Sequence, residues 1–311
     1  MFNSQRKSWF SNYLRSKDVF FIESPFQLIC MQSFIKQNSF VFFRPTSESS
    51  RQQIIELMKY FTLENKFYFL LLFSNSKLGK LKDISFVCLL FLINASSNWH
   101  LGYFRAKVSK FILYFFPTKG LIYYDDGMAT VNIVNEDLLL RYKNIRFRTI
   151  FYKSLNKFPR VEFNDVNAFD NITHYSTKYD NCNVFFGTKL VEGEFITLDE
   201  YTSFVNDSIH RFNVNLYLAH RDETDSKLDC IRELGIKVVK LELPIEIAIK
   251  IKLLTPKIMT GAVTSSLLTT KLLFGGDVYY YSVVNMTKRR KERLINTEKT
   301  FDENGVTKVS L

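Results

Sequence analysis

Short apolar runs alternate along the chain with stretches in which apolar residues recur at helical spacing. Val19–Ile22 is such a run, and a turn sequence and a helical pattern follow it. The unit repeats: Phe40–Phe43 and Lys66–Phe73 are continuous apolar runs, and Ser47–Tyr60 between them has a helical pattern. Strands that are buried on both faces of a parallel sheet have this continuous character. A further run, Gly120–Tyr124, predicts a strand that ends at an acidic pair.

The second half of the chain resumes this alternation after a weak middle. Residues 132–181 are rich in Asn, Lys, Arg and Asp and lack a clear period, which is typical of a connecting region. Beyond them the pattern predicts strands and helices in turn, with a strand as the last element: Asn183–Phe186, Leu198–Arg211, Asn213–Leu218, Glu223–Leu234, Ile236–Leu241, Ile245–Leu253, Lys257–Thr260, Ser265–Phe274 and Val278–Val283. We therefore predict an α/β protein with two Rossmann-like domains, residues 1–165 and 166–311, facing across a cleft.

The charge of the chain narrows its partners to anionic ones. A net charge of +11 suits a nucleic acid, an anionic membrane surface or an anionic substrate such as a nucleotide sugar. Five basic residues gather near the C-terminus, where they would suit peripheral contact with a membrane or equally a solvated helix face: Lys288, Arg289, Arg290, Lys291 and Arg293. No signature of a nucleic-acid-binding module is found in the sequence, so we expect no nucleic-acid partner.

Cysteine spacing and apolar segments indicate a cytoplasmic protein. The four cysteines have neither the spacing of a zinc site nor the density of a disulfide framework. Basic residues interrupt the N-terminal segment, so we predict no cleaved signal peptide. The most apolar stretch, Ile84–Ala95, is shorter than the roughly 20 residues that span a bilayer and predicts a buried helix.

The first candidate for chemistry is the sequence Asp125-Asp126-Gly127, followed by Thr130. Because it follows a predicted parallel strand, it should lie at the carboxyl edge of a sheet, where open α/β folds bind ligands. One carboxylate could act as a general base while the other anchors the loop. An Asp-Asp-Gly sequence also occurs in ordinary turns, and that alternative stays open on these residues alone.

The second candidate is His220, which follows the predicted strand that ends at Leu218. It could act as an acid or as a donor to a leaving phosphate, with Arg221 adding positive charge. Alternatively, it caps a helix that begins near Glu223. The other histidines have no such setting and are interpreted as structural or surface residues: His100, His174 and His210.

The third candidate is a strand-to-helix turn of small and hydroxyl residues that includes Gly261, Thr264, Ser265 and Ser266. Main-chain N–H groups at a helix start bind phosphate well, and hydroxyl groups would assist them. Ordinary capping by Thr264 or Ser265 would be compatible with that role.

Two fainter signals complete the predicted site. Ser24 and Gln27 occupy the first strand-to-helix turn, where they could contact a donor or acceptor sugar, although Pro25 there is also good helix chemistry. Glu246 could contact a ribose, or simply start a helix.

Taken in this order, the motifs resemble those of the bacterial sialyltransferases, which include lipooligosaccharide sialyltransferases and polysialyltransferases. Those families carry an acidic-acidic-Gly motif, a His-Pro motif and a Ser-Ser or Ser-Thr motif, and the opening sequence Ser24 to Leu28 is similar as well. The resemblance runs from about residue 18 to about residue 285. It departs from the family at Arg221, where many members have proline.

The resemblance implies a GT-B-like fold and an inverting, metal-independent transfer of sialic acid from CMP-sialic acid to a hydroxyl of a bacterial surface glycan. Asp126 or Asp125 would be the base on the acceptor side in the N-terminal domain. His220 would be the acid or phosphate partner and Ser265 with Ser266 the phosphate clamp, on the CMP-sugar side. No cofactor or metal is implied, since no Asp-X-Asp is placed like a manganese site and Asp222 and Glu223 are read as the first turn of a helix.

Two rival interpretations are carried forward. One is a transferase of the same fold that uses another nucleotide sugar, such as a UDP-hexose. The other is a non-catalytic basic protein that binds an anionic surface through its +11 charge.

Overall fold

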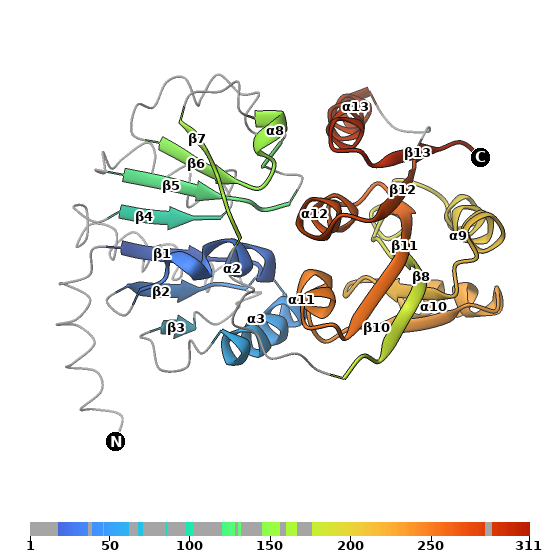
Figure 1. The fold of residues 1–311 in the computed structure, drawn as a ribbon, viewed down its shortest axis with the longest axis horizontal. Helices are drawn as coiled ribbons and strands as arrows, with labels where there is room; N and C mark the ends of the chain where they lie inside the picture. The colour runs from blue at the N-terminus through green and yellow to red at the C-terminus, as the bar shows by residue number, and fades with distance from the viewer. Residues whose placement is uncertain are drawn as a thin grey trace. The chain divides into compact units, whose positions relative to one another are not determined.

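The computed structural model describes residues 18–36, 39–45, 47–61, 68–70, 85, 98–102, 120–127, 130–131, 145–155, 160–166, 176–283 and 288–311. It divides into two compact units, Met1–Asp170 (blue to green in Figure 1) and Asn171–Leu311 (yellow to red). Each unit contains its own parallel sheet, so the prediction of an α/β protein with two Rossmann-like halves is confirmed. The expected cleft between the halves stays a prediction.

Unit 1 contains a seven-stranded sheet in the order β3-β2-β1-β4-β5-β6-β7, and every neighbouring pair is parallel. Its strands are β1 (Asp18–Ile22), β2 (Phe40–Phe43), β3 (Tyr68–Leu70), β4 (Asn98–Leu101), β5 (Gly120–Tyr124), β6 (Ile145–Thr149) and β7 (Val161–Phe163). Its described helices are α2 (Pro25–Met31), η1 (Gln32–Phe34), α3 (Glu48–Tyr60) and α8 (Tyr152–Leu155). The continuous apolar runs of β1, β2 and β5 are buried, as expected for inner strands of a parallel sheet.

Unit 2 contains a six-stranded parallel sheet in the order β10-β9-β8-β11-β12-β13. Its strands are β8 (Tyr179–Phe186), β9 (Leu216–Ala219), β10 (Lys237–Lys240), β11 (Leu254–Ala262), β12 (Asp277–Tyr281) and β13 (Thr307–Val309). Its helices are α9 (Leu198–Phe212), α10 (Asp225–Glu233), α11 (Ile245–Lys250), α12 (Ser265–Phe274) and α13 (Lys288–Glu303). Of the α13 side chains, those of Ile295 and residues 297–303 are described.

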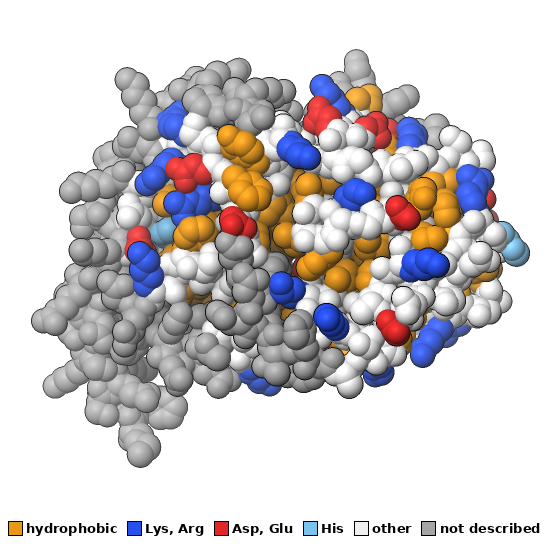
Figure 2. Space-filling view, viewed as in Figure 1, with side chains coloured by type: hydrophobic (Ala, Val, Ile, Leu, Met, Phe, Trp, Pro, Cys, Tyr) orange, Lys and Arg blue, Asp and Glu red, His pale blue; other side chains and the backbone are white. Residues whose placement is uncertain are grey.

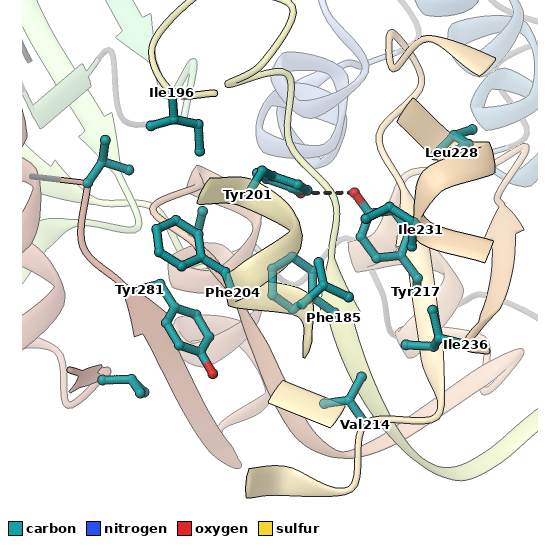
Figure 3. Packing of buried hydrophobic residues seen from close by; sticks show 14 residues of the cluster. Phe185, Ile196, Tyr201, Phe204, Val214, Tyr217, Leu228, Ile231, Ile236 and Tyr281 are labelled. Carbon is teal, nitrogen blue, oxygen red and sulfur yellow. Dashed lines mark hydrogen bonds between the residues drawn. The ribbon is translucent and has the colours of Figure 1, made fainter. Parts of the chain in front are cut away.

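Aromatic side chains fill the core of unit 2 between α9 and the sheet (Figure 3). Phe185 of β8 stacks on Tyr217 of β9, with ring centroids 5.6 Å apart, and Phe204 of α9 stacks on Tyr281 of β12 at 5.1 Å. The two hydroxyl groups of Tyr201 and Tyr217 lie 2.9 Å apart and form the hydrogen bond drawn in Figure 3. Buried tyrosines thus bring hydrogen-bonding groups into an otherwise apolar core.

The prediction of an aperiodic middle, residues 132–181, was wrong in part, because β6, α8 and β7 fall within it. These strands extend one edge of the sheet of unit 1, and ion pairs support their polar side chains. Arg148 Nε donates to Glu162 Oε2 at 2.9 Å, from β6 to its neighbour β7. The alternation of Ile145, Arg146, Phe147 and Arg148 therefore fits a strand that buries one face.

Three other expectations need correction. Strand β12 is not the last element, since α13 and β13 follow it. Helix α10 begins at Asp225 with Thr224 at the N-cap position, so Glu223 precedes the helix. Strand β11 begins at Leu254, earlier than Lys257. The helix predicted over Ile84–Ala95 lies outside the described residues except for its second position, which is helical.

Both sheets reverse their strand order at one place, and this fixes where each unit can bind a ligand. In unit 1 the chain proceeds from β1 to β2 on one side and later returns to β4 on the other. In unit 2 the same reversal separates β8 from β11. Ligands of open α/β sheets bind outside the carboxyl ends of strands at such switch points.

Candidate functional site

The turn after β1 places Ser24 and Gln27 at the switch point of unit 1. Ser24 is the N-cap of α2, and its Oγ accepts a hydrogen bond from the main-chain N–H of Gln27 at 3.2 Å. Pro25 follows at the first helical position, where a missing N–H costs nothing. The turn is therefore closed by its own capping chemistry.

Asp126, at the end of β5, joins this turn. Gln27 Nε2 donates to Asp126 Oδ1 at 2.8 Å, and Ser24 Oγ lies 3.3 Å from the same oxygen. Asp126 N donates to Thr130 Oγ1 at 2.9 Å, and Gly127 between them has a φ of 63°, which favours glycine. The structure thus brings together five residues that the sequence analysis had taken from two separate motifs.

Asp125 points into the protein instead. Its carboxylate is fully buried and accepts hydrogen bonds from Thr149 Oγ1 at 2.7 Å and from the N–H of Ile150 at 2.8 Å. Burial raises the pKa of Asp125 to about 7, although both hydrogen bonds oppose this shift. Asp125 anchors the loop after β5 to the end of β6, and the half-buried Asp126 is the carboxylate nearer to solvent.

Residues that the sequence analysis missed surround this cluster. Glu23 is buried and forms an ion pair with Arg44 at 2.8 Å, and burial raises the pKa of Glu23 to about 7. Gly102 follows β4 at the point where the Gln27 side chain passes, because a Cβ on Gly102 would lie 1.9 Å from Gln27 Cδ. The sequence signal that could have identified Glu23, Arg44 and Gly102 is that each of them follows the end of a strand.

In unit 2, His220 lies directly after β9 and is partly exposed. Its Nδ1 accepts a hydrogen bond from the N–H of Asp222 at 3.2 Å, so the ring proton of the neutral form is on Nε2. Burial, and after it the positive charge of Arg221, lowers the pKa of His220 to about 4. The imidazole of the free protein is therefore neutral at pH 7 and offers a single N–H donor.

The turn that carries His220 is held by Glu223. The Glu223 carboxylate accepts hydrogen bonds from Tyr217 Oη at 2.6 Å and from the N–H of His220 at 2.7 Å, and it pairs with Lys227 Nζ at 2.6 Å. Neither the helix-capping alternative for His220 nor the assignment of Glu223 to the first turn of a helix is correct, since Thr224 is the N-cap of α10.

Lys227 connects this turn to the end of β8. Its buried ammonium group donates to the carbonyl of Thr188 and lies 3.7 Å from the ring centroid of Tyr201. Gly187, directly after β8, allows the Glu223 carboxylate to approach the backbone closely, because a Cβ there would lie 2.5 Å from Glu223 Oε2. The pairing of Glu223 with Lys227 could not be predicted from the sequence, since it depends on burial that only the fold creates.

The third predicted element, the start of α12, is found as expected. Thr264 occupies the N-cap position with extended backbone, but its side chain makes no capping hydrogen bond, so the capping alternative does not hold for this residue. Ser265 and Ser266 form the first turn and are half-buried. Gly261 lets β11 pack closely, since a Cβ there would lie 3.0 Å from the carbonyl oxygen of Phe186. Main-chain N–H groups at such a helix start suit an anion.

Glu246 is buried at the start of α11. Its Oε1 accepts a hydrogen bond from Thr269 Oγ1 of α12 at 2.7 Å, and burial raises the pKa of Glu246. The positive charge of Arg221 opposes that shift.

Three wider features bear on the predicted partners. Among the described residues, no group of three or more His, Cys, Asp and Glu side chains could hold a metal ion. No helix in the described part of the chain is both long enough and apolar enough to cross a bilayer. The basic cluster from Lys288 to Arg293 lies in α13, but its side chains are outside the described residues. On the face seen in Figure 2, the described Lys and Arg side chains are spread out with Asp and Glu among them.

Comparisons with known proteins identify the fold. No family model and no curated protein matches the chain. Among solved structures, the GT-B domain of a sialyltransferase from Photobacterium damselae superposes with a TM-score of 0.55 at 12% identity, covering 94% of this chain and 100% of that one. A second structure of a sialyltransferase from that organism gives 0.54 at 10% identity, covering 95% and 82%. A protein from Listeria monocytogenes assigned as a UDP-N-acetylglucosamine 2-epimerase gives 0.52 at 10% identity, covering 93% and 88%. The chain has a GT-B fold.

Proposed function

We propose that this protein is an inverting glycosyltransferase that moves sialic acid from CMP-sialic acid to a hydroxyl of a bacterial surface glycan. The observation that carries the proposal is the pair of sites at the two switch points. In unit 1, two hydrogen-bond donors hold Asp126, and in unit 2, His220 and the start of α12 follow strands β9 and β11. A base for an acceptor and an anion site for a nucleotide donor are the two functions that such a transfer requires.

Asp126 is the proposed base. Its neighbour Asp125 is buried and has a raised pKa, which suits an anchor that can carry a proton at neutral pH. Asp126 is half-buried and receives donors from the first strand-to-helix turn, which favour an ionised carboxylate. It would take the proton of the acceptor hydroxyl while that oxygen attacks the anomeric carbon, so that one displacement inverts the centre.

His220 and α12 are the proposed phosphate site. The neutral His220 ring would donate its Nε2–H to a phosphate oxygen, and Ser265, Ser266 and the first N–H groups of α12 would supply further donors. These donors would stabilise the departing nucleoside monophosphate without a divalent ion. We therefore expect EDTA to leave turnover unchanged. Arg221 and Glu246 would lie toward the nucleoside.

The rival donor is a UDP-sugar, since a protein assigned to UDP-N-acetylglucosamine chemistry shares the fold. Thermal stabilisation by CMP, UDP and GDP separates the two, and we expect the melting temperature to rise with CMP. Incubation with CMP-sialic acid and glycans ending in galactose or sialic acid, read by mass spectrometry, then tests transfer. A shift with UDP alone, or no release of CMP with any acceptor, would refute the proposed donor.

Two substitutions of His220 test its role in the same assay. His220→Gln keeps an N–H donor that cannot become a cation, whereas His220→Ala removes the donor. Loss of one donor to a developing charge typically costs about 100-fold or more in turnover, so the alanine variant should lose at least that much and the glutamine variant clearly less. Equal losses in both would point to an acid rather than a neutral donor.

The remaining alternative is a non-catalytic protein that binds an anionic surface at the cytoplasmic face of the membrane. It requires Asp126→Asn and His220→Ala to be silent. It also requires neutralisation of Lys288 to Arg293 to abolish binding to vesicles that contain anionic lipid. The proposed enzyme gives the opposite result for the first two variants, and the basic cluster would then only assist membrane contact.

A further inference from the structure

Gln27 was expected to contact a sugar, but the structure gives it another setting. Its side chain is buried, 1% exposed, and it spans from the end of β1 to the end of β5. Gln27 Oε1 accepts a hydrogen bond from the N–H of Glu23 at 2.7 Å, and Gln27 Nε2 donates to Asp126 Oδ1 at 2.8 Å. Both ends of the amide are thus engaged by the protein.

The chemistry of these partners fixes the orientation of the amide. A main-chain N–H can only donate, so it must meet the oxygen of Gln27, and a carboxylate can only accept, so it meets the NH₂ group. A flipped amide would lose both hydrogen bonds. The same reasoning applies to Ser24, whose Oγ accepts from the N–H of Gln27 and therefore directs its own proton to Asp126 Oδ1.

Gly102 completes the arrangement from the neighbouring strand β4. A Cβ at Gly102 would lie 1.9 Å from Cδ, 2.2 Å from Oε1 and 2.3 Å from Cγ of Gln27. Any side chain at position 102 would therefore displace the amide of Gln27. The backbone directly after β4 thus packs against Gln27 at the switch point of the sheet.

We propose that Gln27, seated against Gly102, is a positioning residue that orients Asp126 through Oδ1. The proposal rests on the proposed function, in which Asp126 is the base. Two donors on Oδ1 fix the orientation of the carboxylate that would take the proton of the acceptor hydroxyl. Gln27 acts through Asp126 and does not bind substrate.

The kinetic test uses Gln27→Leu in the full-length protein, with CMP-sialic acid and the acceptor found by mass spectrometry. Without the NH₂ donor, kcat should fall about 10- to 100-fold while KM changes less than about 3-fold, because the orientation of the base is lost and substrate binding is not. The acidic limb of the kcat/KM profile should move to higher pH, since the carboxylate has lost a donor while the neighbouring carboxyl groups of Glu23 and Asp125 are left in place. Gln53→Leu, at a buried glutamine of α3, is the matched control and should leave the profile in place.

A second pair of variants tests the role of Gly102. Gly102→Ala should reproduce the slower turnover and the shifted acidic limb of Gln27→Leu. In Gln27→Ala the space beside position 102 is open, so adding Gly102→Ala should have little further effect. If the losses in kcat of Gln27→Ala and Gly102→Ala multiplied in the double variant, the proposal would be overturned. A rise in KM with kcat unchanged in Gln27→Leu would also overturn it.

Asp126→Asn separates this proposal from the proposed function. If that variant turns over normally, Asp126 is not the base, and the catalytic half of both proposals fails together. If Asp126→Asn is inactive while Gln27→Leu behaves as wild type, only the positioning role fails. If no nucleotide sugar gives turnover, urea unfolding of Gln27→Leu, Asp126→Asn and the double variant tests the contact between the two side chains. A shift of the urea midpoint in the double variant that is smaller than the sum of the two single shifts supports the contact, and an additive shift refutes it.

Discussion

At the scale of single residues, Asp125 and Asp126 are adjacent in sequence but have different surroundings. Consecutive residues at the end of a strand point to opposite faces, so one carboxylate meets Thr149 and Ile150 inside the protein and the other meets the turn after β1. The sequence could place both residues at a sheet edge, but it could not choose between them. The choice depends on β6, whose pattern the sequence analysis did not interpret as a strand.

The buried carboxylate gives a prediction for stability. The pKa of Asp125 is raised in the folded state from 3.8 to about 7, so its favourable contribution is full below the unfolded pKa and is lost as pH rises through about 7. Between pH 5 and pH 7 the loss is on the order of 3 kcal/mol, since each pKa unit is worth about 1.4 kcal/mol. Asp125→Asn, which cannot ionise, should lose less stability between pH 5 and pH 8. Urea unfolding of both proteins at the two pH values measures this, and equal losses would contradict it.

At the scale of elements, helix starts differ in a way that the sequence does not show. Thr197 begins α9 and its side chain accepts from the N–H of Glu200, and Ser47 does the same for the N–H of Ser50 in α3. Thr264 at the start of α12 and Thr224 at the start of α10 also have extended backbone, yet neither side chain makes such a bond. A serine or threonine at an N-cap favours capping in each of these helices, so only the structure separates α10 and α12 from α3 and α9.

This difference predicts unequal costs of substitution. Thr197→Ala should lower the free energy of unfolding by about 1 kcal/mol, which is typical for removal of an N-cap. Thr264→Ala removes no capping bond and should change it by less than about 0.5 kcal/mol. Chemical denaturation of both variants provides the comparison, with Ser47→Ala as a second capped control. A loss at Thr264 as large as that at Thr197 would show that α12 is capped like α9 and α3.

Elements that the sequence analysis missed have polar residues whose partners lie far along the chain. Strand β4 contains His100, which bonds Tyr124 Oη at 2.9 Å and stacks on Phe20 at a centroid distance of 4.0 Å. A local pattern shows a polar residue and cannot show that its partner is buried beside it. The inner strands β1, β2 and β5 were predicted well, because burial on both faces leaves an apolar run that needs no partner to be recognised.

At the scale of the whole molecule, each unit has its own sheet, its own strand-order reversal and its own candidate site. The motifs were predictable, because each follows a strand at a carboxyl edge. The residues that hold them were not, since Gln27 meets Asp126 and Glu223 meets Lys227 only after the strands are assembled. The direct partners of a nucleotide should therefore be found within unit 2, where the predicted anion donors lie.

Hydrogen exchange on the full-length protein tests this division of roles. CMP alone, without acceptor, should slow exchange of main-chain amides in the turn from His220 to Thr224 and in the first turn of α12, because bound phosphate engages N–H groups and stabilises these elements. Peptides that contain Ser24 to Gln27 or the end of β5 should change much less, since they belong to the proposed acceptor side. Ser265→Ala combined with Ser266→Ala should reduce the protection of α12 at a fixed CMP concentration. Protection centred on Asp126 and absent from α12 would assign the nucleotide to unit 1 and reverse the proposed roles of the two units.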